Sequence, residues 1–348
     1  MSEQLFLALT DWNMPKLLEV NTNGLYCAQA DVYIDPWRPV NFALITHGHA
    51  DHMRWGNKKY LVHKDTVPVL KVRLGDVVYQ AIDYNQTITI NGVTFSYHPA
   101  GHILGSSQIR LEYKGEIWVV TGDYKLLPDG LSPEFEPVKC HSFITESTFG
   151  LPIYNFESPI QIFDEILEWV KINQSQHINS IVTCYSLGKA QSILNYFEDI
   201  DIPIFLHGAV ASLNDAFKEN GYYFKGEKIT QETDKNLFKN CMVIAPPAVL
   251  DSAWIRKFGT YKTAFCSGWM QLRGARRRKG VDKGFVFSDH CDFKSLNAAI
   301  DATGAENIYI THGYEDLYAQ YLKSEKGLNA QIMKTLFNDE QEDEEVTL

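Results

Sequence analysis

The stretch Leu44–His52 reads LITHGHADH and places three histidines and an aspartate within six positions, directly after an apolar run. Residues two apart in an extended chain point to the same side, so His47 and His49 can face one point. Asp51 and His52 follow where the chain is expected to turn into a helix. Imidazole and carboxylate donors suit a borderline divalent ion such as zinc. The stretch therefore predicts a metal site at the end of a strand.

Further polar clusters follow apolar, strand-like runs in the same way. Their sequences are PAGHILGS (99–106), VVTGD (119–123), FITEST (143–148), FVFSDHCD (285–292) and YITHGYE (309–315). Strand ends are rigid, and loops that leave one edge of a sheet can converge on one point. We therefore expect the histidines and acids of these clusters to join the first motif: His102, Asp123, Glu146, His290 and His312.

Length and composition narrow the choice of protein class. With 348 residues, 45% of them hydrophobic, the chain can form two domains or one large interrupted domain. The net charge of -11 argues against a surface that coats nucleic acid generally, although it permits a local basic groove. The sequence shows no signal peptide and no apolar run near the ~20 residues of a membrane span. Scattered cysteines without a CxxC pair indicate reduced thiols. We expect a cytoplasmic protein without a membrane partner.

The sequence pattern changes near residue 150. Short β-type runs dominate before it, whereas strands alternate with helical segments after it, beginning with the amphipathic segment 158–173. This βαβ alternation predicts a mainly parallel sheet with helices on its faces. The tail NDEQEDEEVTL (338–348) is acidic and poor in apolar residues, which predicts disorder.

The motifs together resemble those of a known family. HxHxDH after a strand resembles the signature of the metallo-β-lactamase fold, and PAGHILGS and TGD resemble its next two ligand motifs. TEST, SDH and THG resemble the three added motifs of the beta-CASP nuclease branch. The bacterial ligase-associated DNA exonucleases are the most similar group. The resemblance implies an α/β fold, a metallo-β-lactamase αββα sandwich (1–149 and 271–337) with a smaller inserted parallel α/β, or beta-CASP, domain (150–270).

The resemblance also implies which residues bind metal. His47, His49 and His102 would hold one divalent ion, and Asp51, His52 and His312 would hold a second. Asp123 would bridge the two ions. Zinc is the expected metal, with manganese as the alternative. Two such ions can lower the pKa of a shared water, so that hydroxide attacks the scissile phosphate near neutral pH.

Asp51, Glu146 and His290 are the expected catalytic residues. In the family that the chain resembles, the acid orients the histidine, and the histidine protonates the leaving oxygen. Histidine titrates in the range that such a general acid needs. The alternative is that Glu146 and His290 form a structural pair at a domain seam, or that Asp292 partners His290 instead.

Two stretches are candidates for contact with the phosphate backbone. YSLGKAQ (185–191) places Ser186 and Lys189 between a strand and a helix, whose N-terminus can bind phosphate. QLRGARRRKG (271–280) is a dense basic stretch in an acidic chain, although such a stretch is often only a solvated face. Its arginines are Arg273, Arg276, Arg277 and Arg278. Trp269 nearby could stack on a base, with core packing as the alternative.

The motifs favour a two-metal phosphodiesterase that acts on nucleic acid, and the chain plan favours a DNA exonuclease in repair. His312 in the last motif is also found in RNA-processing members of the branch, so an RNA-processing nuclease is the alternative. A hydrolase of a small ester or thioester, and a catalytically inactive scaffold, fit less well, because every expected ligand type is present. The resemblance suggests a functional link to a DNA ligase and a helicase.

Overall fold

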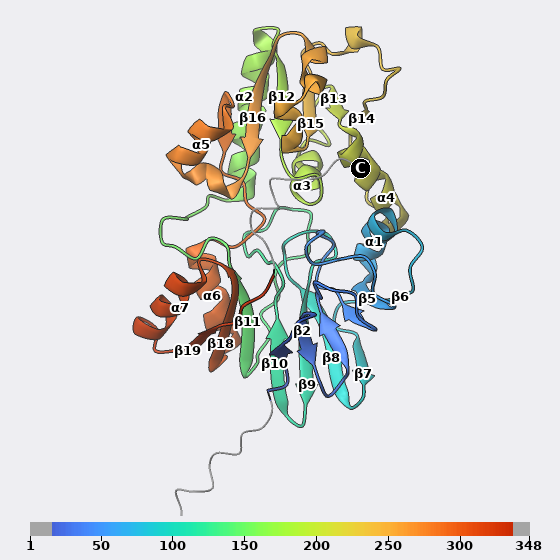
Figure 1. The fold of residues 1–348 in the computed structure, drawn as a ribbon. Helices are drawn as coiled ribbons and strands as arrows, with labels where there is room; N and C mark the ends of the chain where they lie inside the picture. The colour runs from blue at the N-terminus through green and yellow to red at the C-terminus, as the bar shows by residue number, and fades with distance from the viewer. Residues whose placement is uncertain (1–15, 337–348) are drawn as a thin grey trace, which may run out of the picture.

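The computed structural model describes residues 16–336, so the predicted acidic tail, residues 338–348, lies outside the described residues. Three sheets and their covering helices form two lobes, as Figure 1 shows. The lower lobe in that view holds two sheets, and the upper lobe holds the third. This mixed architecture confirms the predicted α/β class.

The two sheets of the lower lobe pack face to face. Their strand orders are β1-β2-β3-β4-β5-β6 and β19-β18-β11-β10-β9-β8-β7. Successive side chains of a strand point to opposite faces, so Leu44 and Leu61 of the first sheet meet Phe95 and Trp118 of the second in one buried cluster. The strands are β1 (Glu19–Val20), β2 (Leu25–Cys27), β3 (Val32–Ile34), β4 (Ala43–Leu44), β5 (Tyr60–His63), β6 (Tyr79–Ile82), β7 (Thr87–Ile90), β8 (Val93–Pro99), β9 (Ser107–Tyr113), β10 (Glu116–Val120), β11 (Ser142–Ser147), β18 (Asn307–Gly313) and β19 (Asn329–Ile332).

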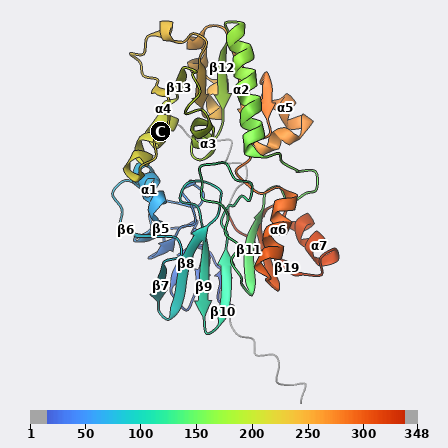
Figure 2. The same cartoon turned by 180° about the vertical axis from the view of Figure 1, so that it is seen from behind.

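Helices cover the outer faces of both sheets and complete an αββα layering. Val69 of α1 packs in one cluster with Val62 of the first sheet. On the second sheet, Phe143 shares a buried cluster with Leu296 of α6 and Tyr318 of α7, both of which Figure 2 shows from behind. The helices are α1 (Val67–Leu74), α6 (Phe293–Thr303) and α7 (Glu315–Ser324).

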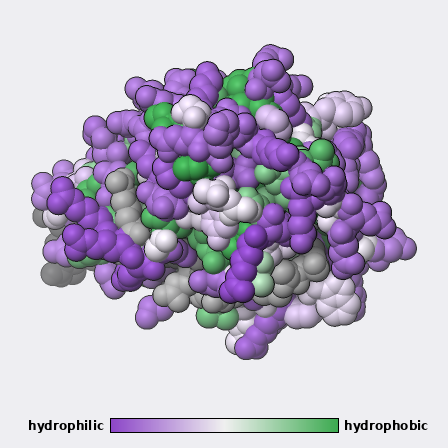
Figure 3. Space-filling view, turned by 90° about the horizontal axis from the view of Figure 1, so that it is seen from above, coloured by the Kyte–Doolittle hydropathy of each residue, from purple (hydrophilic) through white to green (hydrophobic). Residues whose placement is uncertain are grey.

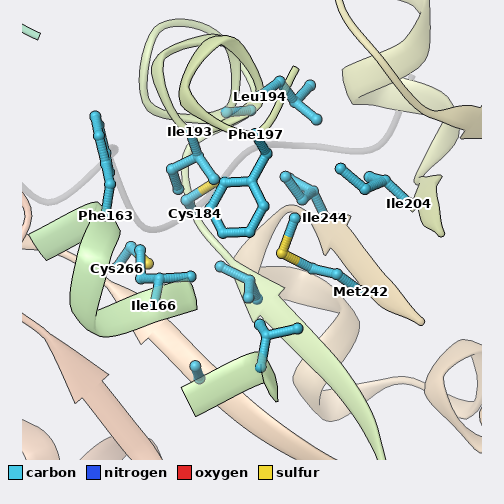
Figure 4. Packing of buried hydrophobic residues seen from close by; sticks show 14 of the residues in the cluster. Phe163, Ile166, Cys184, Ile193, Leu194, Phe197, Ile204, Met242, Ile244 and Cys266 are labelled. Atoms are coloured by element: carbon cyan, nitrogen blue, oxygen red, sulfur yellow. The ribbon is translucent and has the colours of Figure 1, made fainter. Parts of the chain in front are cut away.

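The third sheet confirms the predicted parallel βαβ region. Its order is β14-β13-β15-β12-β16-β17, and its neighbouring strands pair in parallel. Its last strand lies beyond residue 270, where the insert was predicted to end. Figure 4 shows the core, one buried cluster that includes Phe163, Phe197 and Met242. The elements are α2 (Pro159–Ser175), β12 (Asn179–Thr183), α3 (Lys189–Tyr196), β13 (Ile204–Leu206), α4 (Gly208–Phe217), β14 (Glu227–Lys228), β15 (Met242–Ala245), β16 (Tyr261–Cys266), α5 (Arg273–Lys279) and β17 (Lys283–Phe285).

Local sequence explains where α2 begins. The Ser158 hydroxyl accepts from the Gln161 backbone N–H, and the Gln161 side chain accepts from the Ser158 N–H, which together form a capping box. Pro159 occupies the first turn, where its missing N–H costs nothing. Buried residues at helical spacing, including Phe163 and Ile166, then attach the helix to the sheet.

Short 3-10 helices fill several connections: η1 (Lys64–Thr66), η2 (Lys218–Asn220), η3 (Lys235–Leu237), η4 (Pro247–Asp251), η5 (Ala253–Phe258) and η6 (Gly268–Gln271). The face that Figure 3 shows from above is mainly hydrophilic, with small separate hydrophobic patches. Among the described residues, no helix combines the length and the apolar character that crossing a membrane would require.

Candidate metal centre and catalytic site

Sheet topology brings the strand-end motifs together. β10, β11 and β18 are parallel neighbours, so their carboxyl ends share one edge of the second sheet. Asp123 follows β10, Glu146 lies near the end of β11, and His312 lies near the end of β18. The first motif begins just after β4 of the facing sheet. Residues far apart in the sequence therefore meet at the edge below the upper lobe.

One group of donors forms around three histidines. The donor atoms of His47, His49, His102 and Asp123 all lie within 4.8 Å of one another, and all four residues are buried. His47 Nε2 is 3.3 Å from Asp123 Oδ2, and His102 Nε2 is 3.8 Å from the same oxygen. His49 Nδ1 is 3.0 Å from His102 Nε2. The structure thus brings together the residues predicted for the first metal.

The residues predicted for the second metal also lie around Asp123. His52 Nε2 is 3.4 Å from Asp51 Oδ2 and 3.5 Å from Asp123 Oδ2. His312 Nε2 is 3.3 Å from the other oxygen of Asp123, Oδ1. The carboxylate of Asp123 therefore faces both donor groups, as a bridging ligand would.

The spacing and the hydrogen bonding of these donors fit a divalent cation. Four ligands about 2.0–2.1 Å from a tetrahedral zinc ion would be about 3.3 Å apart, and the separations between neighbouring donors are 3.0–3.8 Å. His47 Nε2 is buried and makes no hydrogen bond within residues 16–336. A buried imidazole nitrogen without a partner is costly, and a metal ion would satisfy it.

Outer contacts decide which nitrogen of each histidine faces the centre. His47 Nδ1 lies 3.0 Å from Thr46 Oγ1, and His52 Nδ1 lies 2.8 Å from Asp35 Oδ2. His49 uses its other nitrogen, because Nε2 lies 3.1 Å from the backbone carbonyl of Leu187. His102 Nδ1 lies 2.8 Å from the carbonyl of Asp289. Such partners fix the tautomer and the ring orientation of metal ligands.

Electrostatics divide the histidines into two classes. Burial, helped by neighbouring imidazoles, lowers the pKa of His49 well below its usual range and lowers the pKa of His102 to about 3. Both rings are therefore neutral at pH 7, which is the form that binds metal. Burial opposes the charge on His52 too, but the nearby carboxylates of Asp51, Asp123 and Asp35 raise its pKa to about 10. That surplus of negative charge favours a bound cation.

Glu146 and His290 form the predicted pair. His290 Nδ1 is 2.9 Å from Glu146 Oε1, and both residues are buried. Two backbone N–H groups, of Tyr124 and Thr148, also donate to the Glu146 carboxylate. Glu146 lies close enough to Asp123 and His312 to join their donor group, but its oxygens already hold these contacts. Asp292 instead accepts from the N–H groups of Ser295 and Phe156, so it caps α6.

Several known proteins are similar in sequence to this chain. No protein-family profile matches the sequence. A probable DNA ligase of Opitutus terrae is 30% identical over 315 residues, which are 89% of this chain and 30% of that protein. Endoribonuclease YSH1 of Yarrowia lipolytica is 25% identical over 74% of this chain and 38% of its own length. Subunit 3-I of the Arabidopsis thaliana cleavage and polyadenylation specificity factor is 24% identical over 64% of this chain and 40% of its own length. The chain thus spans 30–40% of the length of these relatives.

A solved structure extends the likeness to three dimensions. A protein of unknown function from Enterococcus faecalis V583 superposes with a TM-score of 0.59, over 85% of this chain and 79% of that one, at 12% identity. The observed architecture matches the predicted one, an αββα sandwich of the metallo-β-lactamase type with an added parallel α/β layer. The third sheet and its helices form this added layer, and β17 of that sheet lies beyond residue 270, the predicted end of the insert.

The insert places Ser186 and Lys189 inside the protein. Lys189 Nζ is 2.6 Å from Asp289 Oδ1, and both side chains are almost fully buried. The Ser186 hydroxyl is buried without a hydrogen-bond partner among the described residues. The role of both residues in phosphate binding stays a prediction, and Lys189 already neutralises a carboxylate next to His290.

The basic stretch forms the short helix α5 at the side of the insert, above α6 and α7 in Figure 1. Arg273, Arg277 and Arg278 are exposed. Arg276 lies on the same helix. Trp269 packs among aromatic rings, with its centroid 4.9 Å from that of Phe149. Nucleic-acid contact by these arginines stays a prediction.

Two acids were missed in the sequence. Asp35 is 2% exposed, and its carboxylate accepts from the Thr46 N–H and hydroxyl while it holds His52. It also follows a strand, as the predicted acids do, so its position was the available signal. Asp289 precedes His290 in the SDH motif, but nothing in the sequence indicates that its carbonyl orients His102.

Proposed function

We propose that this chain is a metal-dependent nuclease that hydrolyses phosphodiester bonds of nucleic acid with two divalent ions, zinc in preference to manganese. Residues 150–270 would form the insert, and 1–149 with 271–337 the catalytic domain. The relatives named above support nuclease chemistry, and the buried histidine–aspartate centre supports the metals. Buried cysteines without disulfides fit a reducing cytoplasm.

The observation that carries this proposal is the carboxylate of Asp123 between two donor groups. Its Oδ2 lies near His47 and His52, and its Oδ1 lies near His312. Bound ions would lower the pKa of an attacking water and neutralise the charge that builds on the phosphate. Because His312 approaches the oxygen that His47 and His52 do not, each carboxylate oxygen has a neighbouring histidine, as a bridging ligand would.

Residues of the protein would protonate the leaving group. The Glu146 carboxylate accepts a hydrogen bond from the Nδ1–H of His290, and it stabilises the doubly protonated ring, whose Nε2–H can then protonate the departing oxygen. The two backbone N–H groups on Glu146 keep this acid in place. Asp51 has a side chain 20% exposed and lies where substrate can reach the centre.

DNA is the proposed substrate, with exonuclease action in repair and a functional link to a ligase and a helicase. The similarity to a protein named a probable DNA ligase, over 89% of this chain, supports this choice. The relatives named endoribonuclease favour RNA as the second candidate. A protein distinguishes the two by whether a 2′-hydroxyl finds a partner.

The test is digestion of end-labelled single-stranded DNA and RNA of matched sequence, with zinc and with manganese. The wild type should cleave one of them, and the end-label pattern reports exonuclease or endonuclease action. Asp123→Ala should lose bound metal and cleavage together, whereas Asp215→Ala, at an exposed carboxylate on α4, should keep both. Full metal content in Asp123→Ala would refute the bridging role.

A further inference from the structure

The candidate centre is open to solvent on one side. His47, His49, His52 and His102 are at most 3% exposed. The Asp51 side chain is 20% exposed, and the His312 side chain is 10% exposed. A polymeric substrate must therefore approach from the side of Asp51 and His312.

Trp55 projects into solvent from the loop that carries Asp51. It is 73% exposed, more than any other large hydrophobic residue that the structure describes. It lies four positions after Asp51, so the two Cα atoms are at most about 14 Å apart. A single exposed aromatic ring is common in itself, so the rigidity of its loop and its charged neighbours decide what it can bind.

The loop that holds Trp55 is rigidly built. Arg54 Nε donates to the Asp51 carbonyl at 3.0 Å, and the Tyr60 hydroxyl donates to the Arg54 carbonyl at 2.8 Å. The Asn57 side chain accepts from the Val40 N–H at 3.0 Å. These bonds on both sides of Trp55 fix the backbone that carries the ring. The exposure of the ring therefore belongs to the fold and is not caused by a loose segment.

The sequence around Trp55 is basic in an otherwise acidic protein. Between residues 36 and 60 the only acid is Asp51, although the whole chain has a net charge of -11. Arg38 and Lys58 are exposed, and the Lys58 N–H donates to the carbonyl of Val40 at 3.0 Å, which joins the two basic segments. Cations around an exposed aromatic ring are the usual composition of a surface that binds single-stranded nucleic acid.

We propose that Trp55 is a stacking platform for one nucleobase of a single-stranded substrate, a few nucleotides from the scissile phosphate, with Arg38 and Lys58 contacting the adjacent backbone. This proposal rests on the proposed nuclease function and identifies where the polymer leaves the centre. Stacking tolerates every base, because each base has a π face. The platform would therefore position the strand without selecting its sequence.

The test is a double-mutant cycle in which the Trp55 ring and one substrate base are removed separately and together. Wild type and Trp55→Ala are compared on an intact single strand and on strands with one abasic site at successive positions. On the intact strand the variant should have a KM raised roughly 5- to 150-fold, with kcat near normal. At one position in the strand, the abasic site should raise the KM of the wild type by the same factor as the Trp55→Ala substitution does. The abasic site at that position should leave the KM of Trp55→Ala unchanged. Trp55→Phe should restore part of the loss.

Matched controls separate this proposal from the nuclease function itself. Tyr223→Ala removes another aromatic residue that is 67% exposed and should leave the KM unchanged. Hydrolysis of bis(p-nitrophenyl) phosphate by Trp55→Ala should also be unchanged, because that ester has no base to stack. A wild type that cleaves neither DNA nor RNA overturns both proposals. Three results would overturn the stacking platform alone. Trp55→Ala could cleave the polymer with a normal KM, or the effects of Trp55→Ala and of the abasic site on KM could add at every position. Trp55→Ala could also lose as much activity on the small ester as on the polymer.

Discussion

Lys189→Met should destabilise the folded chain strongly, because it leaves the Asp289 carboxylate buried without its main cation. Lys189 is 4% exposed and Asp289 is 2% exposed, and their charged atoms are 2.6 Å apart. Burial alone would raise the pKa of Asp289, but the Lys189 ammonium and the imidazoles of His102 and His290 hold that pKa well below its usual range. The carboxylate is therefore charged in the folded protein and depends on these neighbours.

The expected cost follows from that burial. Removing one partner of a buried ion pair costs about 3–5 kcal/mol, whereas removing an exposed pair costs about 1 kcal/mol or less. Lys189→Met should also weaken metal binding, because a displaced Asp289 would no longer hold His102, whose Nδ1 lies 2.8 Å from the Asp289 carbonyl. Loss of such an outer partner lowers metal affinity about 10–100-fold.

Urea unfolding of the metal-free protein measures this cost. Lys189→Met, Asp289→Asn and the double variant form a cycle, and the double variant should be about 2–3 kcal/mol more stable than the sum of the two losses predicts. Lys218→Met, in the exposed pair with Asp215, is the control and should change stability by less than about 1 kcal/mol. If the losses at Lys189 and Asp289 simply add, the pair is not coupled and the reasoning fails.

Other substitutions test separate parts of the site. His290→Gln should lower turnover about 10²–10⁴-fold with normal metal content by elemental analysis, and loss of a metal would make His290 a ligand. Asp35→Asn should weaken metal binding about 10–100-fold in a chelator competition, because His52 loses its charged partner; unchanged affinity would refute this. Replacing Arg277 and Arg278 with alanine should raise the KM for the polymer and reduce its log–log salt slope by roughly 0.7 per lost contact; an unchanged slope would make them a solvated face. Burial lowers the pKa of His63 from 6.5 to about 4, so the unfolded chain binds more protons between these values and stability falls as pH drops. His63→Asn should remove about 2 kcal/mol of the fall between pH 7 and pH 5 in urea unfolding, and an equal fall in both proteins would contradict the shift.

Local pattern was enough to predict the fold class and which histidines and acids gather at one sheet edge. The spacing in residues 47–52 and the acids and histidines after later strands are local features, and the sheet edge places them together. The insert was equally visible, because a βαβ alternation repeats over many residues and each helix carries its own apolar face. The position of its last strand was not visible, because β17 is only three residues long.

Apart from the Glu146–His290 pair, which the family resemblance implied, side-chain partners across long sequence separations could not be predicted in the same way. Lys189 forms an ion pair with Asp289, which lies one hundred positions later in the chain and is brought close only by the fold. The nitrogen that His49 presents depends on the Leu187 carbonyl, which belongs to the insert. The sequence alone determined which residue types gather at the site, because strand spacing and sheet edges are local rules. Only the tertiary structure decided which atom each presents, which charges neutralise one another and which ring stays in solvent, because these depend on contacts between segments far apart in the chain.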